Sequence, residues 1–214
     1  MTDEQERELV AIARERINDD DPSHDFRHAV RILKLAKRIA AKEGGDLDVI
    51  IAAALFHDLI VHSKDSPQSK LSSEHSAEAA GEILRSRAWY PAEKIPRVQR
   101  AIERCSFSKN LPKETIEEEI VQDADLLESL GALAVARTFC STGQMHRPFY
   151  HFEDPAGRHR ELDPRKNALD LFGARLFVAR QRLVTAEARS IGDTRDKFLH
   201  QFFDQFITEI DAAD

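Results

Sequence analysis

The feature that most constrains this chain is an apolar run, Leu47 to Val61, with a histidine and an aspartate inside it. Twelve of its residues are apolar, and the only exceptions are Asp48, His57 and Asp58. The run has neither glycine nor proline, so it predicts a helix packed into the core. A buried carboxylate must be compensated, because moving a charge out of water is costly. A cation that binds both side chains would compensate it, and so would a His–Asp hydrogen bond without a metal.

The overall composition is that of a soluble, ordered globular protein. The 214 residues suit one domain with a sizeable core, and 42% of them are hydrophobic and 32% charged. The net charge of −7 argues against a protein that coats nucleic acid, since no basic excess exists to neutralise phosphates. Two cysteines, Cys105 and Cys140, provide no disulfide framework and indicate a reducing compartment. The acidic N-terminus does not resemble a signal peptide and no apolar run reaches ~18 residues, so we expect a cytoplasmic protein with no membrane partner.

The 3.6-residue periodicity of a helix recurs along the chain, and no alternating strand of useful length appears. Asp21 or Ser23 is expected to cap the second helix, and residues 63–70 are expected to form a loop. Residues 141–163 are too long for a passive connector and could form a lid or wall over a site. The predicted helices cover residues 4–17, 24–42, 46–62, 73–87, 91–105 and 113–138, and a break near Asp123 in the last of these is left open. A further helix starts at Asp163-Pro164. The final helix carries an apolar stripe that seals the core, made of Phe198, Phe202, Phe206 and Ile210.

Further candidate metal ligands lie on helix faces that point towards the core. His28 shares an apolar stripe with Ile39, and His57 lies on the apolar face of its own helix. A single histidine on such a face is more often a satisfied core residue, but two of them with a carboxylate favour a metal site. A further ligand would come from Asp123 or Asp125. Periodicity does not choose between these two, and either could instead cap a break in the helix.

The order His28, then His57-Asp58, then Asp125 resembles the H…HD…D signature of the HD-domain superfamily of metal-dependent phosphohydrolases. Over roughly residues 7–210 the chain also resembles one bacterial branch of that superfamily, which includes nucleoside triphosphate pyrophosphohydrolases. The segments that carry this second resemblance are Ser23-His-Asp-Phe-x-His28, Ala54-Leu-Phe-His-Asp58, Leu71-Ser-Ser, Ile102-x-x-x-Ser-Phe-Ser108 and Val121-Gln-Asp-Ala-Asp-Leu-Leu-Glu-Ser-Leu-Gly131.

The resemblance implies one all-α HD domain over residues 1–214, with the metal site in its helical core. The metal-binding core is expected at about residues 20–135, and helices within residues 164–212 are expected to complete the bundle. Two imidazoles and two carboxylates suit Mn²⁺, which we favour, and also Mg²⁺, Co²⁺, Ni²⁺ or Fe²⁺, whereas Zn²⁺ usually takes fewer ligands. The ligands of this one divalent ion that the resemblance implies are His28, His57, Asp58 and Asp125.

The chemistry of such a metal centre also suggests a set of catalytic and substrate-binding residues. Asp58 is expected to serve catalysis as well as metal binding, since the ion would polarise a phosphoryl oxygen and lower the pKa of a bound water. Lys64, in the loop after the histidine–aspartate pair, is the best candidate to stabilise the developing phosphate charge. Glu74 or His75 could orient the water, or could equally be a first-turn residue that the helix dipole favours. The predicted substrate-binding residues, each of which is individually more often a solvated charge or a packed residue, are His24, Arg27, Lys64, Lys70, Cys105, His146 and His151.

One position departs from the branch, which usually has a histidine before Ser-Phe-Ser where this chain has Cys105. The change would remove a donor near the phosphates. The alternative, which we prefer to a reactive thiol, is that Cys105 packs as a small buried hydrophobe.

These features predict a divalent-metal phosphohydrolase that cuts (deoxy)nucleoside triphosphates to monophosphate and pyrophosphate. The alternatives are a nucleoside monophosphate phosphatase, a nucleotide-binding or metal-sensing module without turnover, and a helical interaction domain whose histidines are core residues. The expected partner is a small phosphate compound, in particular a nucleotide, and not a nucleic acid. A homodimer is left open.

Overall fold

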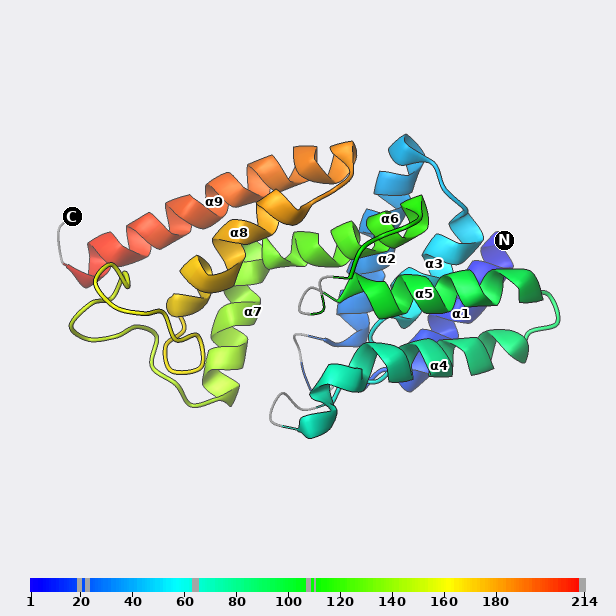
Figure 1. Cartoon of the computed structure of the whole chain (residues 1–214), viewed down its shortest axis with the longest axis horizontal. Coiled ribbons are helices and arrows are strands. Elements are labelled where there is room, and N and C mark those ends of the chain that lie inside the picture. The colour runs from blue at the N-terminus through cyan, green and yellow to red at the C-terminus, as the bar shows by residue number, and fades with distance from the viewer. Residues whose placement is uncertain (19–20, 22–23, 63–65, 107–108, 110, 212–214) are drawn as a thin grey trace. The chain divides into compact units, whose positions relative to one another are not determined.

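Figure 1 shows the computed structural model of the chain, which describes residues 1–18, 21, 24–62, 66–106, 109 and 111–211. Every regular element within these ranges is a helix, which confirms the predicted all-α fold class. The chain divides into two compact units, Met1–Asp125 and Leu126–Asp214, here called the N-terminal and the C-terminal unit. The single domain over the whole chain stays a prediction. None of the described helices combines the length and the apolar character that crossing a membrane requires.

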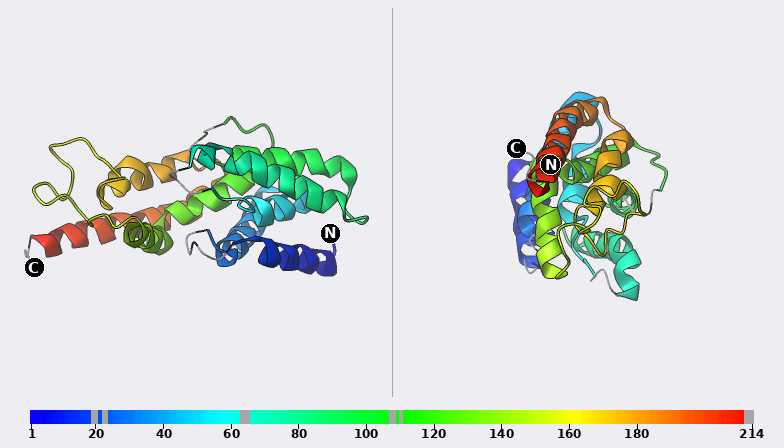
Figure 2. Two further views of the ribbon diagram at one scale, coloured as in Figure 1. Left: turned by 90° about the horizontal axis from the view of Figure 1, so that it is seen from below. Right: turned by 90° about the vertical axis from the view of Figure 1, so that its left-hand side faces the viewer.

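The N-terminal unit is built around one buried helix, α3. Every residue of α3 from Val49 to Phe56 is at most 4% exposed, so this helix is covered on all sides. It contacts α1, α2, α4 and α5, and α4 and α5 run side by side (Figures 1 and 2). The elements of this unit are α1 (Asp3–Arg16), α2 (Phe26–Glu43), α3 (Leu47–Phe56), η1 (Pro67–Leu71), α4 (Ser72–Arg85), η2 (Ala92–Lys94), α5 (Ile95–Cys105) and α6 (Ile116–Leu126), whose last residue begins the next unit.

The buried helix ends at Phe56, so the predicted extension to His62 is wrong. The reason is a set of hydrogen bonds from α4 that replaces the helical ladder. The backbone N–H of Ile60 donates to Ser76 Oγ at 3.0 Å, and that of His62 donates to Ser72 Oγ at 3.1 Å. Because these donors find side-chain acceptors, the chain can leave the helix without a glycine or proline.

The second helix begins at Phe26, after an N-cap that differs from the prediction. Asp25 is the N-cap, and its carboxylate accepts a hydrogen bond from the backbone N–H of His28 at 2.8 Å. Asp21 therefore does not cap this helix, and Ser23 lies outside the described residues. The helix ends as predicted at Gly44, whose φ of +86° is a conformation that favours glycine.

Other boundaries also differ from the predictions. Pro91 precedes the short η2 turn, and α5 starts only at Ile95 because the next proline occupies its first turn. A loop was expected over residues 63–70, but residues 67–71 form the 3₁₀ helix η1. The break expected near Asp123 instead follows α6, where η3 (Leu127–Ser129) leads into the extended Leu130. The next helix, α7 (Gly131–Gln144), begins at Gly131, whose φ is +74°.

The C-terminal unit packs α9 against α7 through aromatic side chains. Phe139 of α7 stacks on Phe206 of α9 with ring centroids 5.7 Å apart. The predicted sealing stripe is wrong at Phe198, which is 43% exposed, whereas the adjacent Leu199 is fully buried. The elements are η3, α7 (Gly131–Gln144), η4 (Phe172–Leu176), α8 (Phe177–Ala179), η5 (Arg180–Arg182) and α9 (Ala186–Ile210).

The segment between α7 and η4 is held by a buried ion pair rather than by a helix at Asp163-Pro164, where the structure has only a turn. The guanidinium of Arg160 binds both carboxylate oxygens of Asp170 at 2.6 Å each. The backbone N–H of Asp163 donates to the same carboxylate at 2.7 Å.

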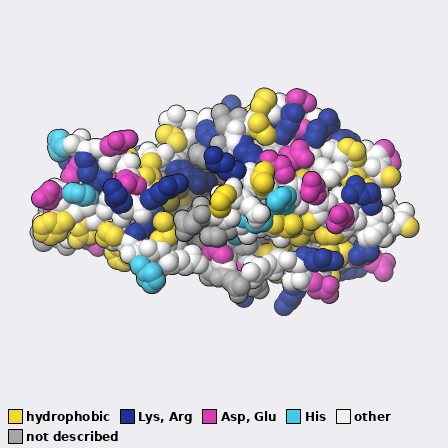
Figure 3. Space-filling view, turned by 60° about the horizontal axis from the view of Figure 1, so that its bottom comes forward, with side chains coloured by type: hydrophobic (Ala, Val, Ile, Leu, Met, Phe, Trp, Pro, Cys, Tyr) yellow, Lys and Arg dark blue, Asp and Glu magenta, His cyan; other side chains and the backbone are white. Residues whose placement is uncertain are grey.

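On the face shown in Figure 3, hydrophobic side chains lie among charged side chains of both signs.

Candidate metal centre

Two buried imidazoles from different helices meet in the N-terminal unit. His28 lies in the first turn of α2 and is fully buried, and His57 follows the last residue of α3 and is 2% exposed. Their Nε2 atoms are 3.1 Å apart. The cap at Asp25 fixes the start of α2 and thereby the position of His28. The predicted convergence of the two histidines is therefore present in the structure.

Two carboxylates complete this cluster. Asp58 Oδ2 lies 3.6 Å from His28 Nε2 and 3.5 Å from His57 Nε2. Asp125 Oδ1, near the end of α6, lies 3.6 Å and 3.9 Å from the same two nitrogens. The side chains of Asp58 and Asp125 are 25% and 27% exposed, whereas the imidazoles are almost fully enclosed. The cluster is therefore closed on the histidine side and open to solvent on the carboxylate side.

The donor set fits one divalent ion. Ligands bonded at about 2.1 Å to a six-coordinate ion lie about 3 Å from their nearest neighbours. The nitrogen–nitrogen and nitrogen–oxygen separations here run from 3.1 to 3.9 Å, so small side-chain movements suffice. His28, His57 and Asp125 each offer a ligand atom within 4.8 Å of the others. A divalent ion at this point would bind the two imidazoles and balance the charge of the two carboxylates at once.

The tautomer of His57 suits metal binding. Its Nδ1 lies 3.0 Å from the backbone carbonyl oxygen of Ala54, one turn earlier in α3. A carbonyl oxygen can only accept, which assigns the ring proton to Nδ1 and leaves the lone pair on Nε2 in the neutral ring. A backbone acceptor of this kind orients metal-binding histidines. The contact with Ala54 therefore leaves Nε2 as the ring atom that could bind a metal.

Periodicity left open whether Asp123 or Asp125 is the ligand, and the two residues have different surroundings in the structure. Asp125 reaches the two histidines, whereas Asp123 is fully buried on another face of α6. The arrangement favours Asp125 as the ligand and gives Asp123 a place in the core.

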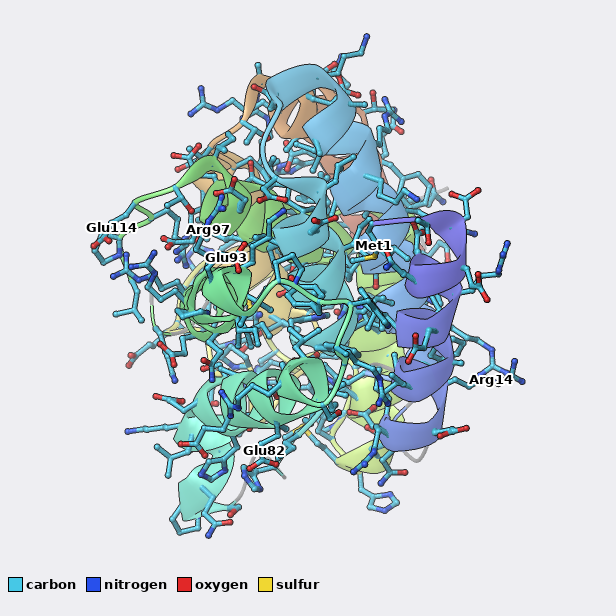
Figure 4. All side chains as sticks on the ribbon, turned by 90° about the vertical axis from the view of Figure 1, so that its right-hand side faces the viewer. Met1, Arg14, Glu82, Glu93, Arg97 and Glu114 are labelled. Atoms are coloured by element: carbon cyan, nitrogen blue, oxygen red, sulfur yellow. The ribbon has the colours of Figure 1, made fainter. Side chains whose placement is uncertain are left out.

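The start of α3 is braced by charged residues of α5 and η2. Lys94 binds Asp46 at 2.9 Å and Asp48 at 2.7 Å. Arg97, labelled in Figure 4, donates to Asp46 at 3.1 Å and to Glu117 at 2.9 Å. The helix that leads into the histidine–aspartate pair is thus anchored at its N-terminal end.

Glu74 is paired with a cation that sequence reasoning missed. Lys109 donates to the Glu74 carboxylate and, at 2.6 Å, to Ser73 Oγ, which itself donates to Glu74 at 3.2 Å. Burial tends to raise the pKa of the Glu74 carboxyl, but the hydrogen bond and charge of Lys109 outweigh it and hold that pKa below its ordinary value. The sequence signal was the position of Lys109, directly after Ser-Phe-Ser.

A second histidine pair lies beyond the proposed ligands. His62 Nε2 and His75 Nδ1 are 2.8 Å apart and join the segment after α3 to the first turn of α4. The sequence offers His75 as a residue that could orient water, but it gives no sign of its partner His62. Here the structure shows a hydrogen-bonded imidazole pair.

The predicted substrate-binding residues fall into different environments, and their roles stay predictions. His24 packs edge-on against His28, with ring centroids 5.9 Å apart, and its Nδ1 lies 2.9 Å from Asp21. Arg27 has a 76% exposed side chain and binds the capping Asp25 at 3.1 Å. The remaining positions are Lys70, exposed in η1, Lys64, which lies outside the described residues, and His146 and His151, which belong to the C-terminal unit.

Cys105 is a buried packing residue. It is 5% exposed, and its thiol donates to the carbonyl oxygen of Ile102 at 3.1 Å. Burial raises the pKa of this thiol well above its ordinary value, and the negative charges of Asp125 and Asp58 raise it further. The thiol therefore stays protonated at neutral pH, in agreement with the preferred alternative.

Comparison with known proteins identifies relatives along nearly the whole chain. A family model described as HD domain matches residues 25–130, a range that includes all four clustered side chains. Bacillus subtilis YpgQ is 30% identical over 203 residues, which cover 92% of this chain and 90% of YpgQ. A crystal structure of YpgQ in complex with ADP has a TM-score of 0.73 and 27% identity, and covers 98% of this chain and 100% of that chain. A Bacillus thuringiensis structure described as an HD-superfamily hydrolase has a TM-score of 0.74 and 26% identity, and covers 98% of each chain.

Proposed function

The chain belongs to the HD-domain superfamily of metal-dependent phosphohydrolases, and on this premise we propose that it hydrolyses a nucleotide at one divalent ion. The observation that carries the proposal is the meeting of two buried imidazoles with two partly exposed carboxylates within 4 Å. The residues proposed to hold the ion are His28, His57, Asp58 and Asp125.

The proposed reaction converts a (deoxy)nucleoside triphosphate to the monophosphate and pyrophosphate. Two observations support a nucleotide substrate: the segments that resemble the pyrophosphohydrolase branch, and the ADP that YpgQ binds in its crystal structure. A nucleoside monophosphate phosphatase is the alternative enzyme. Cys105, in place of the histidine of the branch, is the feature that favours a third candidate, a nucleotide-binding module with weak turnover.

Mn²⁺ is the proposed ion, because a set of imidazoles and carboxylates with open positions suits it. When bound, a divalent ion supplies positive charge that polarises a phosphoryl oxygen and acidifies water. The two imidazoles exclude solvent from one side of the centre, since both are almost fully buried. The carboxylates of Asp58 and Asp125 lie on the open side, where a phosphate can approach.

The protein must also stabilise the charge of the phosphate itself. We assign this role to Lys64, on the basis of its position seven residues after His57. Glu74 is held ionised by Lys109, so its contribution would be to position that lysine and the first turn of α4 rather than to accept a proton.

A product assay tests the proposal. Mn²⁺-loaded protein is incubated with nucleoside mono-, di- and triphosphates, and phosphate and pyrophosphate are measured separately. Pyrophosphate from triphosphates is the expected result. Phosphate released only from monophosphates would establish the alternative enzyme, and nucleotide binding without either product would leave the binding module. Asp125→Asn, measured in parallel, should abolish whichever activity is seen.

A further inference from the structure

The segment that carries Asp58 lies outside a helix. The chain from His57 to His62 forms turns and irregular structure. The N–H of Leu59 still donates back to the carbonyl oxygen of Phe56 at 3.3 Å, which closes one tight turn at the end of α3. The position of Asp58 therefore depends on what holds the residues that follow it.

A single buried hydroxyl of α4 holds this segment. The N–H of Ile60 donates to Ser76 Oγ at 3.0 Å, and the Ser76 hydroxyl donates to the carbonyl oxygen of Ile60 at 3.2 Å. A hydroxyl can donate one hydrogen bond while it accepts another, so one side chain binds both backbone polar groups of Ile60. Ser76 is fully buried, so bulk water does not compete for these bonds. The backbone two residues after Asp58 is thus fixed to a different helix.

Two further contacts join the same segment to the first turn of α4. The N–H of His62 donates to Ser72 Oγ at 3.1 Å, and His62 Nε2 lies 2.8 Å from His75 Nδ1. His75 and Ser76 come three and four residues after Ser72, so the three side chains share one face of the helix. These three residues are here called the α4 clamp.

A cavity lies on another side of the segment. The side chains of Leu59 and Ile60 line a space of about 300 Å³, and the rest of its lining comes from α1, from α4 and from the two residues after α4. Side chains beside a cavity lack packing contacts on that side, so packing alone resists a movement of the segment less strongly there. The hydrogen bonds of the α4 clamp supply the restraint that packing lacks.

We propose that Ser76 is a positioning residue of the metal centre and acts through the carboxylate of Asp58. The inference rests on the proposed function, because it takes Asp58 as a ligand of the divalent ion. His28 and Asp125 lie within α2 and α6, whose own hydrogen bonds hold them, whereas Asp58 follows the end of its helix. A metal ligand must be held within about 0.5 Å of its productive position. For Asp58 the Ser76 hydroxyl provides that restraint.

The test measures the Mn²⁺ affinity of the full chain by isothermal titration and needs no turnover. Ser76→Ala removes both hydrogen bonds to Ile60 and should weaken Mn²⁺ binding by about tenfold or more, the usual effect of losing a residue that orients a metal ligand. In an Asp58→Asn background the same change should weaken binding less than about twofold, because the carboxylate that Ser76 positions is gone. Unchanged affinity in Ser76→Ala would overturn the proposal, and so would equal losses in the two backgrounds.

Thr138→Val is the matched control. Thr138 is 3% exposed, and its hydroxyl donates to the carbonyl oxygen of Ala134 in its own helix at 2.8 Å. The change removes a buried hydroxyl from the C-terminal unit and should leave the Mn²⁺ affinity unchanged. A loss of affinity in Thr138→Val equal to that in Ser76→Ala would reflect general destabilisation and would overturn the proposal.

Ser72→Ala provides a second test, which applies even where Ser76→Ala does not fold by circular dichroism. It removes one contact four residues after Asp58 and should weaken Mn²⁺ binding severalfold, again only when the Asp58 carboxylate is present. Wild-type protein that binds no Mn²⁺ would overturn the proposed function together with this inference. Wild-type binding that neither serine variant weakens would overturn this inference alone.

Discussion

His28 Nε2 and His57 Nε2 lie 3.1 Å apart, although 29 residues separate the two histidines in the sequence. Two imidazole nitrogens at this distance share either a proton or a cation. Carboxylate oxygens of Asp58 and Asp125 within 4 Å of both nitrogens favour the cation.

Asp123 and Asp125, both in α6, should have different roles: Asp125 in metal binding and Asp123 in stability. Asp125→Asn should lower the affinity for Mn²⁺ by at least about a hundredfold, because it removes an anionic ligand from the cluster. Asp123→Asn should retain one ion per chain and cost about 1–3 kcal/mol of stability, since it alters a buried polar group outside the cluster. Isothermal titration with Mn²⁺ and thermal unfolding measure the two effects. Equal metal affinity in both variants would contradict the assignment.

Glu74 should not act as the general base. Because Lys109 holds the pKa of Glu74 below its ordinary value, its carboxylate is fully ionised at neutral pH and is a weak proton acceptor. Glu74→Gln should therefore lower kcat/KM without changing the shape of its pH profile, and Lys109→Met should have a similar effect. Loss of an acidic limb of the profile in Glu74→Gln alone would show that Glu74 is the base.

The sequence was sufficient to predict the all-α fold and the helix that carries His57. Both depend on local patterns: an uninterrupted apolar run for α3 and a glycine stop for α2. The end of α3 was not predictable in the same way. It depends on Ser72 and Ser76, which accept backbone N–H groups from a segment 10 to 16 residues earlier.

The candidate site was predictable only in part for the same reason. The spacing of His28 and His57 on apolar faces indicated a metal centre, but periodicity could not choose between Asp123 and Asp125. Contacts made by residues distant in sequence, such as Lys109 with Glu74, leave no periodic signal at all. The capping role of Asp25 was missed because Asp21 and Ser23 offered equally good capping chemistry nearby.

The two cysteines should differ in reactivity. Burial and neighbouring carboxylates raise the pKa of the Cys105 thiol, so little thiolate is present at pH 8. Cys140, which is only partly buried, should be alkylated by iodoacetamide in the native protein while Cys105 reacts only after unfolding. Mass spectrometry of the labelled peptides measures both. Rapid native labelling of Cys105 would show that it is not a packed residue.

The Arg160–Asp170 pair should stabilise the C-terminal unit in a pH-dependent way. Burial raises the pKa of Asp170, but Arg160 and the N–H of Asp163 outweigh burial and lower that pKa below its ordinary value. The carboxylate therefore contributes stability above the unfolded-state pKa of about 3.9, and this contribution is lost as the pH falls through the lower folded-state value. Asp170→Asn should cost about 3 kcal/mol at pH 7 and progressively less below pH ~4.

Asp193→Asn is the matched control for this prediction. Asp193 also binds an arginine, Arg180, at 2.6 Å, but its side chain is 58% exposed and that of Asp170 is 1% exposed. Calorimetric unfolding at pH 7 and pH 3 should therefore show a smaller loss for Asp193→Asn. Equal losses at both pH values for Asp170→Asn would contradict the role of its ionised carboxylate.

Anomalous scattering from a crystal grown with Mn²⁺ tests the metal centre most directly. We predict one strong peak about 2.0–2.3 Å from His28 Nε2, His57 Nε2 and one carboxylate oxygen each of Asp58 and Asp125. The peak should disappear in a crystal of His57→Ala. A wild-type crystal in which these four side chains surround only water, or in which manganese binds elsewhere, would contradict the account.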